Sequence, residues 1–283
     1  NSSTNYVIEG EGFVFQRTRE GATLNISNKV HTIIQRENPA TGKLEPPIHI
    51  YSDRLQFVSI EAEGPDHRIA HYTQNVRVED PDMDLTSGSL RVAVPPGTNQ
   101  VRRIVAREDV KIRSKADGSE AMGDFAAYVS TPEEETLMLS GNPVWRDAQN
   151  EGRAKQFIFD RKQKIVYGYT NAQLKLPRTA MASPDLVQPD AAAGPANTNA
   201  PVQLTAEFFE IALPATNRPS RSLIAKTNVV ISSPADKTTA TSAVATFDDA
   251  SGILDLQGNA VWQSDQTVAR ANRITVNRTN QTF

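Results

Sequence analysis

The chain has 283 residues, which is enough for one large domain or two ordinary ones. Thirty Lys and Arg residues against 33 Asp and Glu residues leave a net charge of -3, which excludes a nucleic-acid-binding protein that works by bulk positive charge. The sequence has no cysteine, so disulfides, thiol catalysis and cysteine metal sites are excluded. We predict a protein without a nucleic-acid partner, a metal or a cofactor.

The N-terminal sequence and the hydropathy of the chain indicate its location in the cell. No apolar run reaches the ~18 residues of a membrane-spanning helix. The sequence opens at Asn1 without a signal peptide. We therefore expect an exported protein whose leader or anchor has been removed.

Short segments of alternating apolar and polar residues predict β-strands. They lie at residues 23–26, 76–78, 90–94, 110–112 and 157–159, each bounded by Gly, Pro, Asn or Asp. Residues 151–164 are the best helical candidate. Their counterpart in a repeat contains Ile274, Thr275 and Val276, a β-branched alternation that favours a strand. The predicted fold class is all-β.

The strongest pattern is internal repetition. Residues 106–129 recur at 225–248, and residues 139–161 recur at 256–278. In the second match, Leu-Ser-Gly-Asn-Pro-Val-Trp-Arg at 139–146 becomes Leu-Gln-Gly-Asn-Ala-Val-Trp-Gln at 256–263. The chain therefore carries two long copies of one unit.

A shorter period lies inside the long one, because an Asn or Asp residue repeatedly precedes an alternating pair. The positions are Asn75, Asp109, Asn142, Asn228 and Asn259. The first and third residues after each one share a face of a strand, since side chains alternate across a strand. Stacked units would align these residues into an apolar stripe.

A local change in amino-acid composition predicts the domain boundaries. Five Pro and seven Ala residues fall within 177–201, which is typical of a linker or loop. We predict an N-terminal β-jelly-roll region at 1–177, a Pro/Ala-rich linker at 178–201 and a second β-repeat region at 202–283. The first 70 residues do not align with the repeats.

Several of these segments together resemble the OstA-like family. They are Ala-His-Tyr-Thr-Gln-Asn-Val-Arg-Val at 70–78, Leu-Arg-Val at 90–92, residues 104–112, and Ala-Ala-Tyr at 126–128 followed by Leu-Met-Leu-Ser-Gly-Asn at 137–142. The family includes the periplasmic lipopolysaccharide transport proteins LptA and LptC and the N-terminal domain of LptD. The resemblance covers about 70–177 and 203–283. Pro143 and Ala260 depart from the family pattern, which usually has a β-branched residue after Gly-Asn.

The resemblance implies an open, twisted antiparallel β-jelly roll built from tandem OstA-like repeats. Its apolar groove would shield lipopolysaccharide acyl chains in the periplasm of a Gram-negative-type cell envelope and bridge inner and outer membrane components. It implies no enzymatic activity. The implied partners are lipopolysaccharide or a related glycolipid, and other OstA-like transport components joined by end-to-end strand addition. Head-to-tail self-association stays open, as does the choice between LptA-like, LptC-like and LptD-like.

The apolar positions of the repeats are the candidate lipid-binding residues. They are Val76, Val78, Leu90, Val92, Val110, Ile112, Leu139, Trp145, Phe157, Phe159, Val229, Ile231, Leu256, Trp262 and Ile274. By alternation alone, this face would more often be the filled core of a β-sandwich or barrel. The resemblance shifts the interpretation toward a groove.

Two other classes of protein remain as alternatives. A parallel β-helix, either a polysaccharide-active or an adhesive surface protein, also repeats Gly-Asn motifs, but its turns usually take about 20–30 residues. A carbohydrate-binding β-sandwich would need exposed aromatic residues, whereas both tryptophans fall on the predicted inner face.

Polar motifs predict no catalytic or metal site. The segment Asp80-Pro-Asp-Met-Asp84 begins like a calcium loop but lacks the Gly and Glu that an EF-hand needs. His67 and His71 have a spacing that suits a helix better than a strand. Arg102, Arg103 and Arg107 are either lipid-phosphate ligands or, more commonly, ordinary surface arginines.

Overall fold

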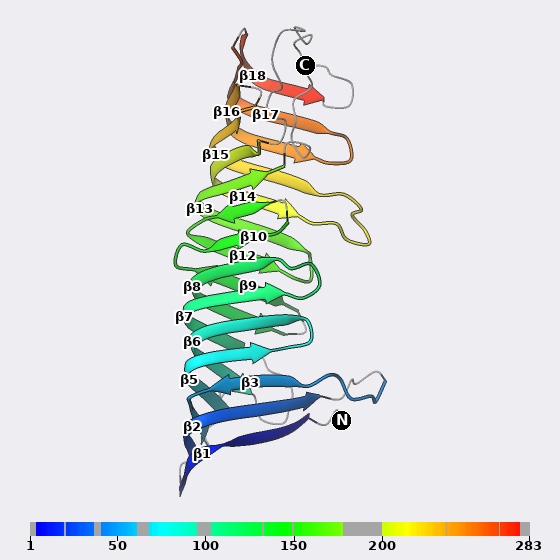
Figure 1. Cartoon of the computed structure of the whole chain (residues 1–283). Helices are drawn as coiled ribbons and strands as arrows, with labels where there is room; N and C mark the ends of the chain where they lie inside the picture. Colours follow the sequence, from blue (N-terminus) through cyan, green and yellow to red (C-terminus); the bar gives the residue numbers. More distant parts are fainter. Residues whose placement is uncertain are drawn as a thin grey trace. The chain divides into compact units, whose positions relative to one another are not determined.

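The structure is a computed structural model that describes residues 4–19, 21–36, 41–60, 68–94, 103–131, 133–148, 150–177, 200–235, 237–265 and 267–277. The regular elements in these ranges are β-strands, and their pairings within each unit are antiparallel (Figure 1). The predicted all-β antiparallel jelly roll is therefore confirmed, and the parallel β-helix alternative is wrong. None of the described segments forms a helix long and apolar enough to cross a membrane.

The chain divides into two compact units, Asn1–Gly141 and Asn142–Phe283. The strands of unit 1 are β1 (Thr4–Thr18), β2 (Gly21–Arg36), β3 (Ile48–Ser52), β4 (Arg54–Ile60), β5 (Arg68–Glu79), β6 (Met83–Val94), β7 (Arg103–Ser114), β8 (Glu120–Ser130) and β9 (Glu135–Ser140). Each pairs with the next, except that β3 and β4 lie end to end between β2 and β5.

Unit 2 repeats this plan. Its strands are β10 (Val144–Arg146), β11 (Glu151–Arg153), β12 (Gln156–Asp160), β13 (Ile165–Leu176), β14 (Val202–Ala212), β15 (Ser222–Ser233), β16 (Thr238–Asp248), β17 (Ile253–Gln263) and β18 (Val268–Asn277). The strands β11 and β12 both pair with β13, one after the other. The segment 151–164 is thus two short strands and a turn, which confirms its strand assignment.

Most long strands bend near the middle, and left-handed backbone marks the bend. Glu108 and Asp109 have φ angles of 67° and 51°, and Thr227 and Asn228 have φ angles of 66° and 53°. The pairing register shifts at the same places, between Arg107 and Val110 and between Lys226 and Val229. Asn and Asp tolerate this conformation better than other side chains. The Asn/Asp period of the sequence is therefore the period of the strand bends.

The bends also confirm the long repeat. The pair Glu108–Asp109 in β7 corresponds to Thr227–Asn228 in β15, and Gly141–Asn142 corresponds to Gly258–Asn259 in β17. One further bend, at Thr170 and Asn171 in β13, was not found in the sequence.

The predicted linker at 178–201 lies outside the described residues apart from Ala200 and Pro201. The strands on either side of it, β13 and β14, pair directly from Leu176 with Val202 to Ile165 with Ala212. The predicted domain division stays a prediction. The first 70 residues, whose register the sequence left open, supply β1 to β4 of unit 1.

Candidate functional site

The bends divide each unit into two walls that enclose an apolar interior. In unit 1, the strand halves before the bend of β5 and their neighbours form one wall, and the halves after it form the other (Figure 1). Side chains of the two inner faces line up in rows across neighbouring strands. One wall carries the row Leu55, Tyr72, Leu90, Ala106, Ala126 and Leu139. The other carries Thr32, Ile50, Val78, Leu85, Ile112 and Ala121.

Unit 2 has equivalent rows. One contains Phe157, Gly168, Phe209, Ala225, Ala245, Leu256 and Ile274. The other contains Leu174, Leu204, Ile231, Ala240, Trp262 and Ala269. In the first row Gly168 lies between Phe157 and Phe209 for a packing reason, because a Cβ atom on Gly168 would lie 2.4 Å from the Phe209 ring.

The interior is closed near the bends and more accessible away from them. On β7 the exposed fraction rises from 1% at Val110, next to the bend, to 9% at Ile112, and on β15 it rises from 1% at Val229 to 6% at Ile231. Likewise Phe157 is fully buried, whereas Phe159 is only partly buried. We call the part next to the bends the apex and the part farthest from them the mouth.

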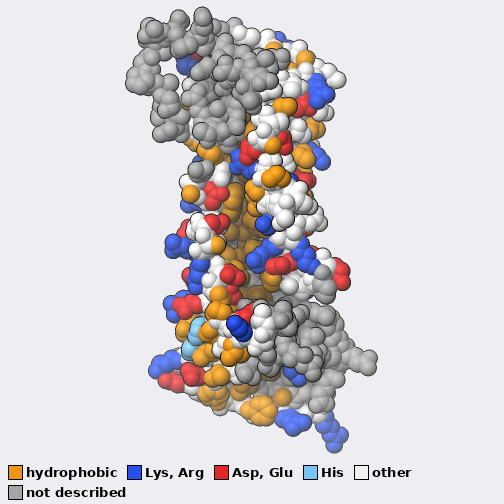
Figure 2. Space-filling view, turned by 90° about the vertical axis from the view of Figure 1, so that its right-hand side faces the viewer, with side chains coloured by type: hydrophobic (Ala, Val, Ile, Leu, Met, Phe, Trp, Pro, Cys, Tyr) orange, Lys and Arg blue, Asp and Glu red, His pale blue; other side chains and the backbone are white. Residues whose placement is uncertain are grey.

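The fifteen candidate residues lie on the inner faces of both units. Those next to the bends, such as Val76, Leu139 and Leu256, are buried among the protein's own side chains. Val78, Trp145 and Phe159 are partly exposed. Figure 2 views the right-hand side of Figure 1, and hydrophobic side chains there are recessed between charged and polar ones.

One hydrogen bond crosses the interior of unit 1. The Tyr72 hydroxyl on one wall donates to the Thr32 Oγ1 on the other at 3.2 Å, and both residues are at most 3% exposed. Burial is the main cause that raises the pKa of Tyr72 to about 12, so the hydroxyl stays protonated. The pair holds the walls together at this level. No periodic signal in the first 70 residues could have predicted it.

Ionic contacts cluster on the outer surfaces. The Glu151 carboxylate in β11 receives hydrogen bonds from Arg153 at 2.8 Å, Arg146 at 3.0 Å and Lys175 at 3.2 Å. The hydrogen bond from Arg153, with the hydrogen bond and charge of Lys175, outweighs partial burial and lowers the pKa of Glu151 to about 2. In β17 burial acts to raise the pKa of Asp255, but hydrogen bonds from Arg273, Gln257 and Thr275 keep it below its usual value.

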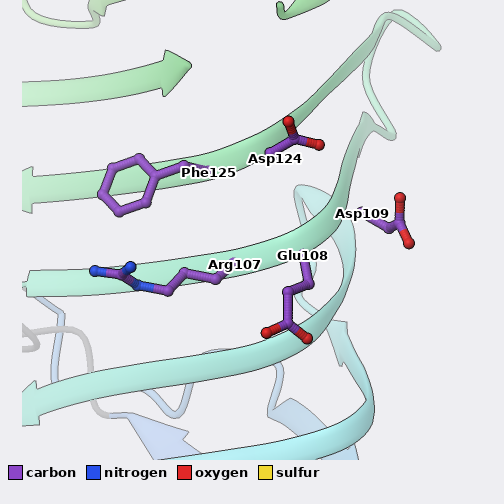
Figure 3. A pocket seen from close by; sticks show the side chains of 5 residues that line it. All are labelled: Arg107, Glu108, Asp109, Asp124 and Phe125. Atoms are coloured by element: carbon purple, nitrogen blue, oxygen red, sulfur yellow. The ribbon is translucent and has the colours of Figure 1, made fainter. Parts of the chain in front are cut away.

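Two hollows lie on the outside of unit 1. The first, of about 450 Å³, lies at the bend of β7 and β8, where Figure 3 shows the carboxylates of Glu108, Asp109 and Asp124. The second, of about 430 Å³, lies on the outer face of β5 to β8 and is lined by His71, Ser89, Arg91, Ala93, Arg103, Val105, Arg107 and Phe125. The sequence singled out Arg103 and Arg107, but Arg91 and His71 join them only through strand pairing. Arg102 and His67 lie outside the described residues.

Two bent walls of antiparallel strands around an apolar interior define a β-jelly roll, and this interior is its candidate site. Residues 50–165 match the model of the family described as "LptA/(LptD N-terminal domain) LPS transport protein". This match confirms the resemblance to the OstA-like family over these residues. The match begins before residue 70 and does not include the second copy at 203–283, for which the resemblance stays a prediction. No curated protein matches the chain.

The matched family consists of lipopolysaccharide transport proteins associated with the Gram-negative periplasm or envelope, and it is not an enzyme family.

Proposed function

We propose that the chain is a periplasmic lipid-binding transport protein that shields lipopolysaccharide acyl chains between the walls of its jelly rolls and bridges inner and outer membrane components. The observation that carries this proposal is the apolar interior that becomes accessible toward the mouth, in a chain whose residues 50–165 match a lipopolysaccharide transport family. One acyl chain of about 12–14 carbons, fully buried at ~0.8 kcal/mol per methylene, gains on the order of 10 kcal/mol.

The burial at the apex limits where a lipid contacts the protein. Val110 and Val229 are 1% exposed, so they touch an acyl chain only if the walls separate. Residues nearer the mouth, such as Val78 and Phe159, contact it without that movement. The proposal therefore ranks the fifteen candidates, with the mouth residues first.

Site-specific photocrosslinking in cells with labelled lipopolysaccharide tests this ranking. A photoreactive side chain at Val78, Trp145 or Phe159 is expected to crosslink strongly to the lipid, and one at Val110 weakly. Lys111 and Lys155 are the matched controls, because both are exposed and lie outside the interior. Crosslinks that arise only from the two lysine positions would refute the proposal.

The free edge of unit 1 supports a proposal about the partners. Within the described residues of that unit, β1 pairs only with β2, so the backbone groups on its other edge are available to a further strand. Phe13, Val14 and Phe15 on β1 are 53%, 51% and 65% exposed. We propose that the occupant is an edge strand of another OstA-like chain, joined by β-augmentation, since the family resemblance implies end-to-end assembly.

This contact is tested with a photoreactive side chain at Phe15 and a control at Leu44, which is also 65% exposed but lies outside the strands. We expect adducts from Phe15 whose digests contain peptides of an OstA-like chain, a second copy of this chain included. Leu44 should give no such adduct. Adducts only to proteins of other folds would contradict the assignment.

A further inference from the structure

The outer face of unit 1 gathers positive charge around the second hollow. The hollow of about 430 Å³ lies over the first-wall halves of β5 to β8. Arg91 on β6 and Arg103 and Arg107 on β7 line it, together with His71 on β5. The small side chains of Ser89 and Ala93 leave space between them.

The strand register forces these groups together. His71 is directly opposite Arg91, and Arg91 is directly opposite Val105. Val105 is flanked on its own face by Arg103 and Arg107, so the Arg91 side chain has a guanidinium on each diagonal. Like charges in such neighbouring positions destabilise a sheet.

Acidic residues do not neutralise this cluster. No ion pair of Arg91, Arg103 or Arg107 occurs among the described residues, whereas Arg77, Arg146 and Arg153 each lie within 3.1 Å of a carboxylate. The chain has 33 acidic residues, so a shortage of acids is not the reason. A cluster of unpaired guanidiniums in a concave surface is suited to an anion.

Arg107 is also held in position. Its guanidinium lies 5.2 Å from the centre of the Phe125 ring, in a cation–π contact. Figure 3 shows both side chains directed along the strands away from the bend, where the carboxylates of Glu108, Asp109 and Asp124 lie. Glu108 instead covers Gly88, where a Cβ atom would approach its carboxylate oxygen at 2.4 Å. The neighbouring acid therefore leaves Arg107 available to a ligand.

We propose that this hollow binds the phosphate group of a small phosphorylated ligand, outside the apolar interior. Guanidinium forks pair with phosphate oxygens in a bidentate way, and three of them converge here. The volume lies within the range of small-molecule sites. Two sources share this chemistry, a phosphorylated glycolipid headgroup and a soluble sugar phosphate. The site rests on the outer face of unit 1 alone and does not depend on acyl chains entering the interior.

The test is calorimetric titration of the full chain with glucose 1-phosphate, with glucose as the neutral comparison. We expect binding of glucose 1-phosphate but not of glucose. The double substitution Arg91→Gln/Arg107→Gln should weaken it by about tenfold or more. Arg113→Gln is the matched control, because it removes the same charge from an exposed position on β7 outside the hollow, and it should change affinity by less than about twofold.

A second titration distinguishes the two sources. If a glycolipid headgroup is the ligand, lipopolysaccharide micelles should bind more tightly than the same micelles treated with phosphatase, and the double substitution should abolish that difference while crosslinks from Val78 persist. If the difference is absent but glucose 1-phosphate binds, the ligand is soluble. The proposal is overturned if neither phosphorylated probe binds the wild-type chain, or if Arg113→Gln weakens binding as much as the double substitution.

Discussion

The contacts of Glu151 show how single residues hold strands together in unit 2. Its carboxylate joins Arg146 on β10, Arg153 on β11 and Lys175 on β13. The folded state stabilises the ionised carboxylate of Glu151, because the pKa of this residue is about 2 in the fold against an ordinary value of 4.5. The contribution of Glu151 to stability is therefore complete above pH ~4.5 and is lost as the pH falls toward 2.

Replacement of Glu151 tests this dependence. Glu151→Gln is expected to lower the free energy of unfolding by about 1 kcal/mol at pH 7, since part of the Coulomb energy is screened by solvent. The difference from wild type should shrink as the pH is lowered from about 4.5 toward 2. Urea unfolding followed by tryptophan fluorescence measures it. Glu120→Gln is the control, since Glu120 is half exposed and lies 4.0 Å from Arg113. A difference that does not change with pH would contradict the assignment.

The strand bends are the feature that matters at the level of the elements. Gly258 has a φ of 78°, and a Cβ atom there would lie 2.7 Å from the Cβ of Ala243 on β16. Gly118, in the turn between β7 and β8, has a similar φ of 69° but open space around it. The two glycines thus share the backbone strain that a side chain would meet and differ in crowding.

Alanine substitution at both positions separates these two effects. Gly118→Ala should lower the free energy of unfolding by about 1 kcal/mol, from left-handed backbone alone. Gly258→Ala should cost about 1–3 kcal/mol more, because β16 and β17 must move apart. Urea unfolding measures both. Equal losses in the two variants would show that crowding at the bend is unimportant.

The bends also explain how much of the fold the sequence could predict. Asn75, Asp109 and Asn228 were recognisable because few side chains accept left-handed backbone, so the spacing of the strands was predictable. The preceding residues Gln74, Glu108 and Thr227 share that conformation without any compositional signal. Thr170 and Asn171 fall outside the regular spacing, and their bend was missed.

The candidate site was predictable only in part for a similar reason. Alternation correctly assigned the inner face, but it is a local property and does not say which inner residues lie at the apex. The contact of Tyr72 with Thr32 joins positions 40 residues apart. Similarly, Arg91 and His71 join the arginines of β7 only through the register of three strands. Such placements depend on long-range pairing, which local patterns do not encode.

For the whole molecule, the proposed function makes the separation of the two walls testable. The hydrogen bond from Tyr72 to Thr32 is a natural place to hold the walls of unit 1 together. The sequence has no cysteine, so a pair of introduced cysteines reacts without competition. A short bis-maleimide linker between Thr32→Cys and Tyr72→Cys would fix the walls at this level.

We expect the linked protein to keep its lipid crosslinks from Val78, which shares a row with Thr32 and Ile50, and to lose the weak crosslinks from Val110, which contacts a lipid only when the walls separate. Crosslinks from Phe159 in unit 2 should be unchanged and serve as the internal control. The same double-cysteine variant without the linker controls for the substitutions. Loss of the Val78 crosslinks in the linked protein would show instead that the walls must separate before a lipid reaches even the mouth.

The two-residue bend has a consequence for how such a scaffold can grow. The bend is specified by two adjacent residues of the same strand, so each hairpin carries the residues that make it bend. Duplication of a stretch between two Asn or Asp positions would therefore add strands whose apolar face already points to the interior, without any change in the rest of the sequence. A gene could lengthen this kind of scaffold by copying, and the two matching segments of the present chain have the form that such copying would leave.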